Sequence, residues 1–292
     1  MGIQRMRWLT VLLAVALVLG LLAGCAPKKP AEPAKPAEPQ QPAQPQQPQG
    51  LSGSIQIAGS TSVQPLSEEL AKAFMTKNPG VTINVAGGGS GAGIKAAQNG
   101  TADIGASSRA LKPEEKGTVV EHQIATDGIA VVVHPSNKVD GLTLAQVKDI
   151  FTGKITNWKQ VGGKDAPITV FRREDGSGTL GAFTELVLGE GTKITDKALQ
   201  QNSNGAMRTA VAGDPNAIGF LSFGYLNNEV KAVKIEGVEA TVDNVKAGKY
   251  KLSRPFLYLT QKQPEGVVKA YIDFVLSPEG QQIVGKEYIT VK

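Results

Sequence analysis

Strand and helix patterns alternate along the chain from Ser54 to Leu276, and this alternation restricts the fold more than any other sequence feature. Short β-branched or apolar runs, such as Val81–Ala86 and Ile129–His134, predict strands. Segments with apolar residues every three or four positions, such as Gln64–Lys77, predict amphipathic helices between them. This alternation is typical of βαβ units, so the sequence predicts an α/β fold with mixed, mostly parallel sheets. The same patterns predict further strands over 54–58 and 102–105, and further helices through 94–98 and over 143–151, 178–188 and 266–276.

The first 24 residues have the pattern of a segment that is removed from the mature protein. Arg5 and Arg7 precede an uncharged apolar run that ends at Leu22-Ala23-Gly24-Cys25. A basic start, a short apolar stretch and small residues before the break predict a secretory signal peptide over 1–24. The ending resembles the lipobox of bacterial lipoproteins, which implies a diacylated Cys25 and attachment to the outside of the cell membrane. The alternative is an N-terminal transmembrane anchor with an incidental cysteine.

Residues 26–50 contain eight of the seventeen prolines, one at every third position. This spacing favours polyproline II and leaves nothing to bury, so 25–50 is predicted to be a lipidated cysteine plus a tether. At about 3.1 Å per residue, such a tether reaches roughly 75–80 Å. A ligand for an SH3-type domain is the alternative use of this segment.

Composition excludes several classes of protein. An apolar content of 41% excludes a wholly disordered chain, and a single cysteine excludes a disulfide scaffold. With only two histidines in the chain, we expect no metal site, and no cofactor motif is present. Five of the 31 basic residues and two of the 26 acidic ones precede residue 51, so the globular part is nearly neutral and no nucleic-acid partner is expected.

Four turns rich in glycine and hydroxyl side chains stand out, each predicted to connect a strand to a helix. At the carboxyl ends of strands in an α/β sheet, such turns offer unpaired N–H groups and hydroxyl donors to an anion. Helix N-capping is the alternative reading of any single turn. None of the turns has the GK[ST] ending of a nucleotide-hydrolysing loop or the full dinucleotide fingerprint. The four turns are Ala58–Ser62, Gly87–Gly91, Gly105–Arg109 and Arg173–Thr179.

Together these motifs resemble the PstS family, the phosphate-binding substrate receptors of bacterial phosphate ABC transporters. The resemblance implies a two-lobed periplasmic-binding-protein fold joined by two crossover strands, with the ligand in the cleft. Lobe one is then 51–129 plus 255–292, and lobe two is 130–254. The implied partners are inorganic phosphate, ABC permease subunits and, through the lipid, the membrane, and a monomer is expected. The segments that carry the resemblance are AGSTSVQP, GGGSGAG, DIGASSRAL, FRREDGSGT, DGIAVVVHP, NAIGF and RPFLYLT.

The resemblance also assigns roles to individual residues. Arg173 is implied to form a charge-assisted bond to the ligand, oriented by Asp175. Ser108 occupies the position where family members often carry a carboxylate that accepts a proton from phosphate, which leaves the choice of oxyanion open. The remaining ligand-binding residues implied are Thr61 through its hydroxyl, Ser62 through its backbone N–H, Ser90, Ser177, Gly178 and Thr179.

Two further functions remain open from the sequence. The same fold could serve as a receptor or sensor for sulfate, molybdate, tungstate or arsenate. A secreted serine hydrolase acting through Ser62 or Ser177 is the catalytic alternative, but neither His122 nor His134 belongs to a glycine-serine turn. We therefore expect a binding protein rather than an enzyme.

Overall fold

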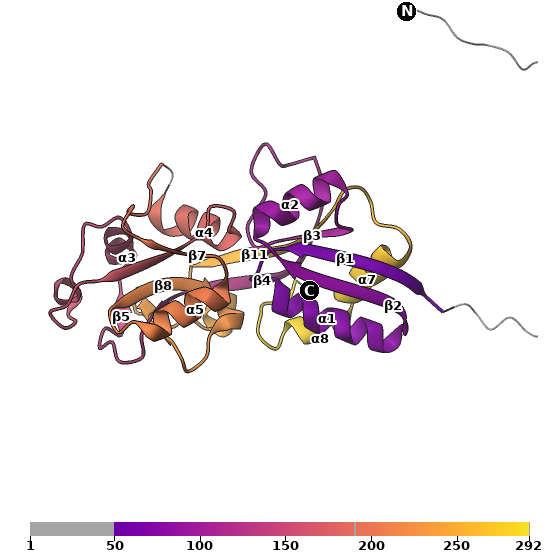
Figure 1. The fold of residues 1–292 in the computed structure, drawn as a ribbon. Coiled ribbons are helices and arrows are strands. Elements are labelled where there is room, and N and C mark those ends of the chain that lie inside the picture. Colours follow the sequence, from indigo (N-terminus) through magenta and orange to yellow (C-terminus); the bar gives the residue numbers. More distant parts are fainter. Residues whose placement is uncertain (1–49, 190, 292) are drawn as a thin grey trace, which may run out of the picture. The chain divides into compact units, whose positions relative to one another are not determined.

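The computed structural model describes residues 50–189 and 191–291, which form two α/β lobes side by side (Figure 1). The predicted signal peptide, Cys25 and the proline-rich tether lie outside the described residues. One continuous sheet passes through both lobes, and β9 (Lys231–Ala232) pairs with its strand β4. The order of the other strands is β2 (Gly80–Gly87), β1 (Ser52–Gly59), β3 (Ile104–Ser107), β11 (Ser253–Thr260), β4 (Val120–Val133), β8 (Ala217–Ser222), β6 (Thr169–Arg173) and β7 (Leu199–Gln201). No helix within the described ranges is long and apolar enough to cross a membrane.

Lobe one combines the first elements of the chain with the last helices. Strand β1 lies between β2 and β3 and pairs with both in parallel, so the carboxyl ends of all three face the same edge. Helix α1 has Pro65 in its first turn and ends before Pro79, and its buried face includes Leu66, Leu70 and Phe74. The elements are β1 (Ser52–Gly59), α1 (Gln64–Lys77), β2 (Gly80–Gly87), α2 (Ser90–Asn99), β3 (Ile104–Ser107), α7 (Gly266–Val275) and α8 (Pro278–Val284).

Lobe two is built around β6 and β8, which pair in parallel. Buried aromatic rings fill its core, with Phe183 stacked on Phe220 at 4.0 Å between ring centroids. Its elements are β5 (Gly141–Leu142), α3 (Leu144–Phe151), η1 (Trp158–Val161), β6 (Thr169–Arg173), α4 (Gly178–Phe183), η2 (Thr184–Leu188), β7 (Leu199–Gln201), α5 (Asn204–Gly213), β8 (Ala217–Ser222), η3 (Phe223–Tyr225), β9 (Lys231–Ala232), β10 (Lys234–Ile235) and α6 (Val242–Lys246).

Two long strands, β4 (Val120–Val133) and β11 (Ser253–Thr260), join the lobes. They pair with each other antiparallel, with Arg254 opposite Asp127. Within the described ranges, four of the nine strand pairings are antiparallel, and each of these four involves β4 or β11. The hydrophobic cores change at this crossing, because one uses residues up to Ala125 and from Phe256 onward, and the other uses residues from Ile129 to Leu252.

Local sequence patterns located the elements from β1 to β4 and the helices α3, α4 and α7, whereas elements such as α5, β8 and α8 were not predicted. The predicted helix over 64–77 matches α1 at both ends. The predicted helix over 178–188 is divided, because α4 continues as the π-helical turn η2. The turn at 105–109 is not followed by a helix as expected, since the chain runs from β3 through turns and bends to β4.

Candidate functional site

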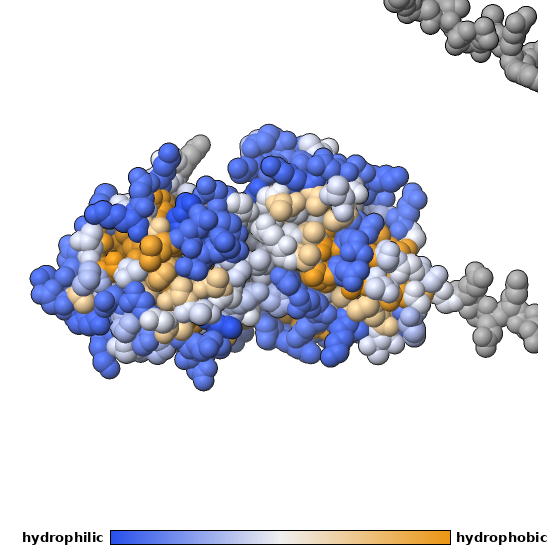
Figure 2. Space-filling view, in the orientation of Figure 1, coloured by the Kyte–Doolittle hydropathy of each residue, from blue (hydrophilic) through white to orange (hydrophobic). Residues whose placement is uncertain are grey.

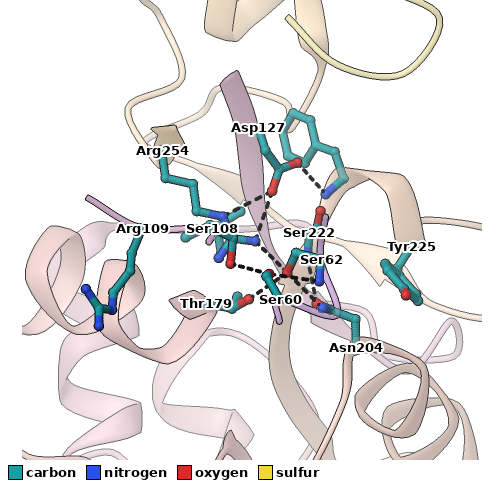
Figure 3. A network of polar contacts seen from close by, with 12 residues as sticks. Ser60, Ser62, Ser108, Arg109, Asp127, Thr179, Asn204, Ser222, Tyr225 and Arg254 are labelled. Carbon is teal, nitrogen blue, oxygen red and sulfur yellow. Dashed lines mark hydrogen bonds and ion pairs between the residues drawn. The ribbon is translucent and has the colours of Figure 1, made fainter. Parts of the chain in front are cut away.

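Six hydroxyl side chains from four segments meet between the lobes, and we call them the hydroxyl cluster. Each segment lies at the carboxyl end of a strand, where ligand sites of α/β sheets are found. All six residues are buried. They are Ser60, Thr61 and Ser62 after β1, Ser90 at the start of α2, Ser108 after β3, and Thr179 in α4 of lobe two. Figure 3 labels Ser60, Ser62, Ser108 and Thr179 of this cluster.

Within lobe one, the cluster is linked by short hydrogen bonds. The Ser60 hydroxyl donates to Ser108 Oγ at 2.8 Å, and the backbone N–H of Ser108 donates to Ser90 Oγ at 3.0 Å. The backbone N–H of Ser62, expected to face the ligand, donates to Ser60 Oγ at 3.2 Å instead. The hydroxyl of Ser62 lies 2.9 Å from Thr179 Oγ1 of lobe two, so the Ser62 side chain is what reaches across.

Arg173 brings a buried positive charge to the same place from the end of β6. Its Nη2 donates to Thr61 Oγ1 at 3.2 Å, and its Nε and Nη2 each donate to a carboxylate oxygen of Glu174 at 2.9 Å. Within the described ranges its buried Nη1 has no hydrogen-bond partner. A bidentate carboxylate therefore orients the guanidinium and leaves one of its edges unused.

The expectation that Asp175 orients Arg173 is wrong. Asp175 is 86% exposed and pairs with Arg172 at 2.9 Å. Successive side chains of a strand point to opposite faces, so Arg172 and Arg173 diverge. Glu174, directly after the strand, remains close enough to reach the buried arginine, whereas Asp175 stays at the surface.

A second buried arginine enters the cluster from the strand crossing. The Nε and Nη2 atoms of Arg254 donate to Asp127 Oδ2 at 3.1 and 2.9 Å, and Nη2 also donates to Ser62 Oγ at 3.0 Å (Figure 3). Burial raises the pKa of the Asp127 carboxyl, and the attraction of Arg254 opposes this rise. Among the described residues, Arg254 Nη1 is buried and has no hydrogen-bond partner, like that of Arg173.

Two more residues of lobe two complete the site and were missed from the sequence. Asn204, the first residue of α5, donates from Nδ2 to Thr61 Oγ1 at 3.1 Å and to Ser62 Oγ at 2.8 Å. The hydroxyl of Tyr225 donates to the backbone carbonyl of Thr61 at 2.8 Å, and burial raises its pKa. The only sequence signal for Asn204 is its place behind Ser203, whose hydroxyl caps the start of α5.

The start of α4 packs directly against lobe one. The Ser177 hydroxyl accepts from the Leu180 N–H and so caps the helix, while the first amides of a helix lack partners within it. A Cβ atom added at Gly178 would lie 2.2 Å from Ser90 Oγ and 2.7 Å from Ser108 Oγ. Only a glycine permits this approach, and the backbone N–H of Gly91 donates across to the carbonyl of Gly176 at 3.0 Å.

The surface of this region is notched where α2 and α4 approach each other (Figure 2). Arg109, which follows Ser108 in the sequence, points away from the hydroxyl cluster (Figure 3). It forms a bidentate pair with Glu115 at 2.7 and 2.8 Å. The charge of Arg109 is therefore paired with Glu115 outside the hydroxyl cluster.

The structure places both histidines away from the hydroxyl cluster. The Nε2 atom of His122 hydrogen-bonds to Thr260 Oγ1 at 3.0 Å, and Nδ1 of His134 bonds to the hydroxyl of Ser136 at 2.8 Å. Neither interaction provides a base for Ser62 or Ser177. In the part of the chain that the structure describes, no group of three His, Cys, Asp or Glu side chains could hold a metal ion.

Comparison with known proteins gives a consistent result. A family model described as PBP superfamily domain matches residues 39–279. Phosphate-binding protein PstS of Bacillus subtilis is 36% identical over 247 residues, which cover 82% of this chain and 81% of that protein.

Two solved structures are similar over nearly their whole length. One from Clostridium perfringens, assigned to the substrate-binding proteins of phosphate ABC transporters and holding phosphate, is 50% identical with a TM-score of 0.80. The matched region covers 82% of this chain and 100% of the Clostridium perfringens chain. An ABC-type phosphate transport receptor from Vibrio cholerae is 39% identical with a TM-score of 0.68, covering 81% of this chain and 99% of its own. The chain described here belongs to the PstS family of the PBP superfamily.

Proposed function

We propose that this protein captures inorganic phosphate in the hydroxyl cluster between its lobes and delivers it to an ABC permease. The observation that carries the proposal is the pair of buried arginines, Arg173 and Arg254, which both contact the cluster. Within residues 50–189 and 191–291, the Nη1 atom of each has no hydrogen-bond partner. Buried guanidinium groups with unspent N–H donors, surrounded by hydroxyls, suit a small oxyanion.

The supply of donors matches a tetrahedral anion better than a neutral ligand. Each of the two arginines is partly offset by a carboxylate, Glu174 for Arg173 and Asp127 for Arg254. The site is therefore rich in hydrogen-bond donors without a large excess of positive charge. Selection by a dense set of donors discriminates strongly between ligands, because a ligand that leaves buried donors unpaired is penalised.

Some residues of the proposed site contact the ligand, and others hold the contacting side chains in place. We propose that the ligand is bound by Thr61, Ser62, Ser90, Ser108, Arg173, Ser177, Gly178 and Thr179. To these we add Arg254 as a second cationic contact, with Glu174 and Asp127 holding the two guanidinium groups in place.

The two lobes are proposed to open and close about the crossing of β4 and β11. We place the boundaries after residue 129 and after residue 254, close to the point where one hydrophobic core gives way to the other. Since donors come from both lobes, one anion contacts all of them only in a closed arrangement. The protein acts as a monomer in this scheme and catalyses no reaction.

We further propose that the protein acts outside the cytoplasm. Residues 1–24 serve as the signal peptide, Cys25 carries the lipid, and residues 25–50 hold the lobes away from the membrane. The support for this is the basic and apolar start of the chain, the single cysteine after Leu22-Ala23-Gly24, and the proline at every third position.

Titration calorimetry against phosphate, sulfate, arsenate, molybdate and tungstate tests the proposal. We expect phosphate to bind most tightly and the larger molybdate and tungstate to bind weakly. Binding of another oxyanion with no heat from phosphate would identify a different receptor. Turnover of a chromogenic phosphate ester that is lost in Ser177→Ala would instead establish a hydrolase.

A further inference from the structure

The hydroxyl oxygens of Thr61 and Ser62 differ from the rest of the hydroxyl cluster, because each accepts two hydrogen bonds from side-chain nitrogens. Ser62 Oγ accepts from Arg254 Nη2 at 3.0 Å and from Asn204 Nδ2 at 2.8 Å. Thr61 Oγ1 accepts from Arg173 Nη2 at 3.2 Å and from Asn204 Nδ2 at 3.1 Å. All of these nitrogens are donors that cannot accept.

A hydroxyl oxygen has two lone pairs, and here both are used. The hydrogen of each hydroxyl must therefore point to a further acceptor. For Ser62 the neighbour in that direction is Thr179 Oγ1 at 2.9 Å. Among the described residues, no acceptor is bonded to the hydroxyl hydrogen of Thr61.

The orientation of the Asn204 amide is fixed by its other end. The backbone N–H of Ser222 donates to Asn204 Oδ1 at 3.1 Å, and this contact requires the oxygen on that side. The NH₂ group must then face Thr61 and Ser62. Asn204 is fully buried, so water does not compete for these bonds.

We infer that Asn204, as a positioning residue acting with Arg173, locks the Thr61 hydroxyl as an obligate donor toward the ligand while Ser62 donates to Thr179, so that this side of the site accepts only deprotonated ligand oxygens. The inference rests on the proposed function and extends it to the protonation state of the ligand. Dibasic phosphate, with three deprotonated oxygens, satisfies the Thr61 donor, and sulfate does so as well.

A protonated oxygen of the ligand must face a group that can still accept a hydrogen bond. The linked hydroxyls of Ser60, Ser90 and Ser108 offer this, because a serine whose lone pairs are not all used can accept. No carboxylate of the kind that demands a proton stands at position 108. The site therefore accepts a dianion without requiring a second proton on it.

Charged or titratable groups face this region from each neighbouring element. Asp127 and Glu174 each accept two hydrogen bonds from the arginine beside them. The groups are Glu68 on α1, Asp127 on β4, Arg173 and Glu174 at the end of β6, Arg208 on α5, Tyr225 in η3 and Arg254 on β11.

The substitution Asn204→Asp tests the inference with little change of shape. The new carboxylate keeps an oxygen for the Ser222 N–H, but it replaces the NH₂ donor by an acceptor. Thr61 would then donate to it and turn a lone pair toward the ligand. Asn202→Asp is the matched control, since Asn202 is exposed and lies two residues away.

Phosphate and sulfate affinities of the purified protein are measured by calorimetry between about pH 6 and pH 8. In the wild type we expect phosphate affinity not to fall with rising pH, and sulfate to compete at large excess. In Asn204→Asp we expect the ratio of phosphate to sulfate affinity to rise about tenfold or more, since one hydrogen bond to a charged group is reversed. We also expect phosphate binding to weaken toward high pH, with Asn202→Asp unchanged in both respects.

An unchanged selectivity ratio and an unchanged pH profile in Asn204→Asp would overturn the inference and leave the proposed function intact. A wild type that binds neither anion would overturn both. If Asn204→Asp unfolds, as its melting curve would show, Asn204→Ala decides the matter. That variant removes the donors without adding charge and should raise the selectivity ratio by a smaller factor, whereas an unchanged ratio would refute the inference.

Discussion

At the scale of single residues, two adjacent arginines have opposite environments. Arg173 is 1% exposed and contacts Thr61, whereas Arg172 lies on the outer face and pairs with the exposed Asp175. We expect Arg173→Ala to weaken phosphate binding by about 2–4 kcal/mol, the range for removing one partner of a buried charged hydrogen bond. Arg172→Ala should leave binding unchanged. Calorimetry on both variants checks this, and equal affinities would show that the site is placed wrongly.

The pair of Arg109 and Glu115 gives a pH-dependent expectation at the same scale. The hydrogen bond from Arg109 lowers the pKa of the Glu115 carboxyl. With a lowered folded pKa, the pair stabilises the fold above the ordinary glutamate pKa of about 4.3, and this contribution is lost as the pH falls through the lowered value. Glu115→Gln should therefore lower the free energy of unfolding at neutral pH and have a shrinking effect in acid. Urea unfolding at several pH values across this range measures the effect, with the exposed Glu114→Gln as control. If Glu115→Gln lowered the free energy of unfolding by the same amount at every pH, the expectation would be contradicted.

At the scale of elements, the contact of α4 with lobe one depends on one missing side chain. A Cβ atom at Gly178 would lie 2.2 Å from Ser90 Oγ, whereas one at Gly176, in the same turn, would meet nothing within 4 Å. We expect Gly178→Ala to hold the lobes apart and to weaken phosphate binding by about 1–3 kcal/mol, the usual range for overpacking. Gly176→Ala should bind like the wild type. Melting curves show whether each variant is folded, and full affinity in folded Gly178→Ala would contradict the role given to this contact.

At the scale of the whole molecule, the proposed closure rests on the division of donors between the lobes. Ser62 reaches Thr179, Asn204 reaches Thr61, and Gly91 bonds to Gly176 across the cleft. We expect the radius of gyration from small-angle scattering to decrease when phosphate is added. Arg173→Ala at the same phosphate concentration is the control. An unchanged radius in the wild type under saturating phosphate would show that binding occurs without closure.

The proposed attachment to the membrane through Cys25 is also tested at the scale of the whole molecule. If Cys25 is acylated, Cys25→Ser should give an uncleaved precursor or a released product without lipid. The partitioning of the wild-type and variant proteins from the producing cells between detergent and aqueous phases measures this. Equal recovery of wild type and variant in the detergent phase would favour a transmembrane anchor instead.

Much of the fold was determined by the sequence itself, because the forces that shape each element act between near neighbours. The apolar spacing of Gln64–Lys77 and the proline that follows it are sufficient to locate α1. The glycine-serine turns likewise mark strand ends, and parallel strands bring those ends to one edge. The positions of Thr61, Ser90 and Thr179 in one buried cluster therefore follow from local patterns combined with a general property of α/β sheets.

Only the tertiary structure decided which side chains complete the site. Asn204 lies 142 residues from Ser62, and Arg254 lies 192 residues from it, so no local pattern could pair them. The choice of Glu174 over Asp175 as the partner of Arg173 depends on which residue of a turn faces the other lobe. The physical reason is the same in each case. Burial between two separately packed lobes sets these contacts, and burial is a property of the assembled molecule rather than of any segment.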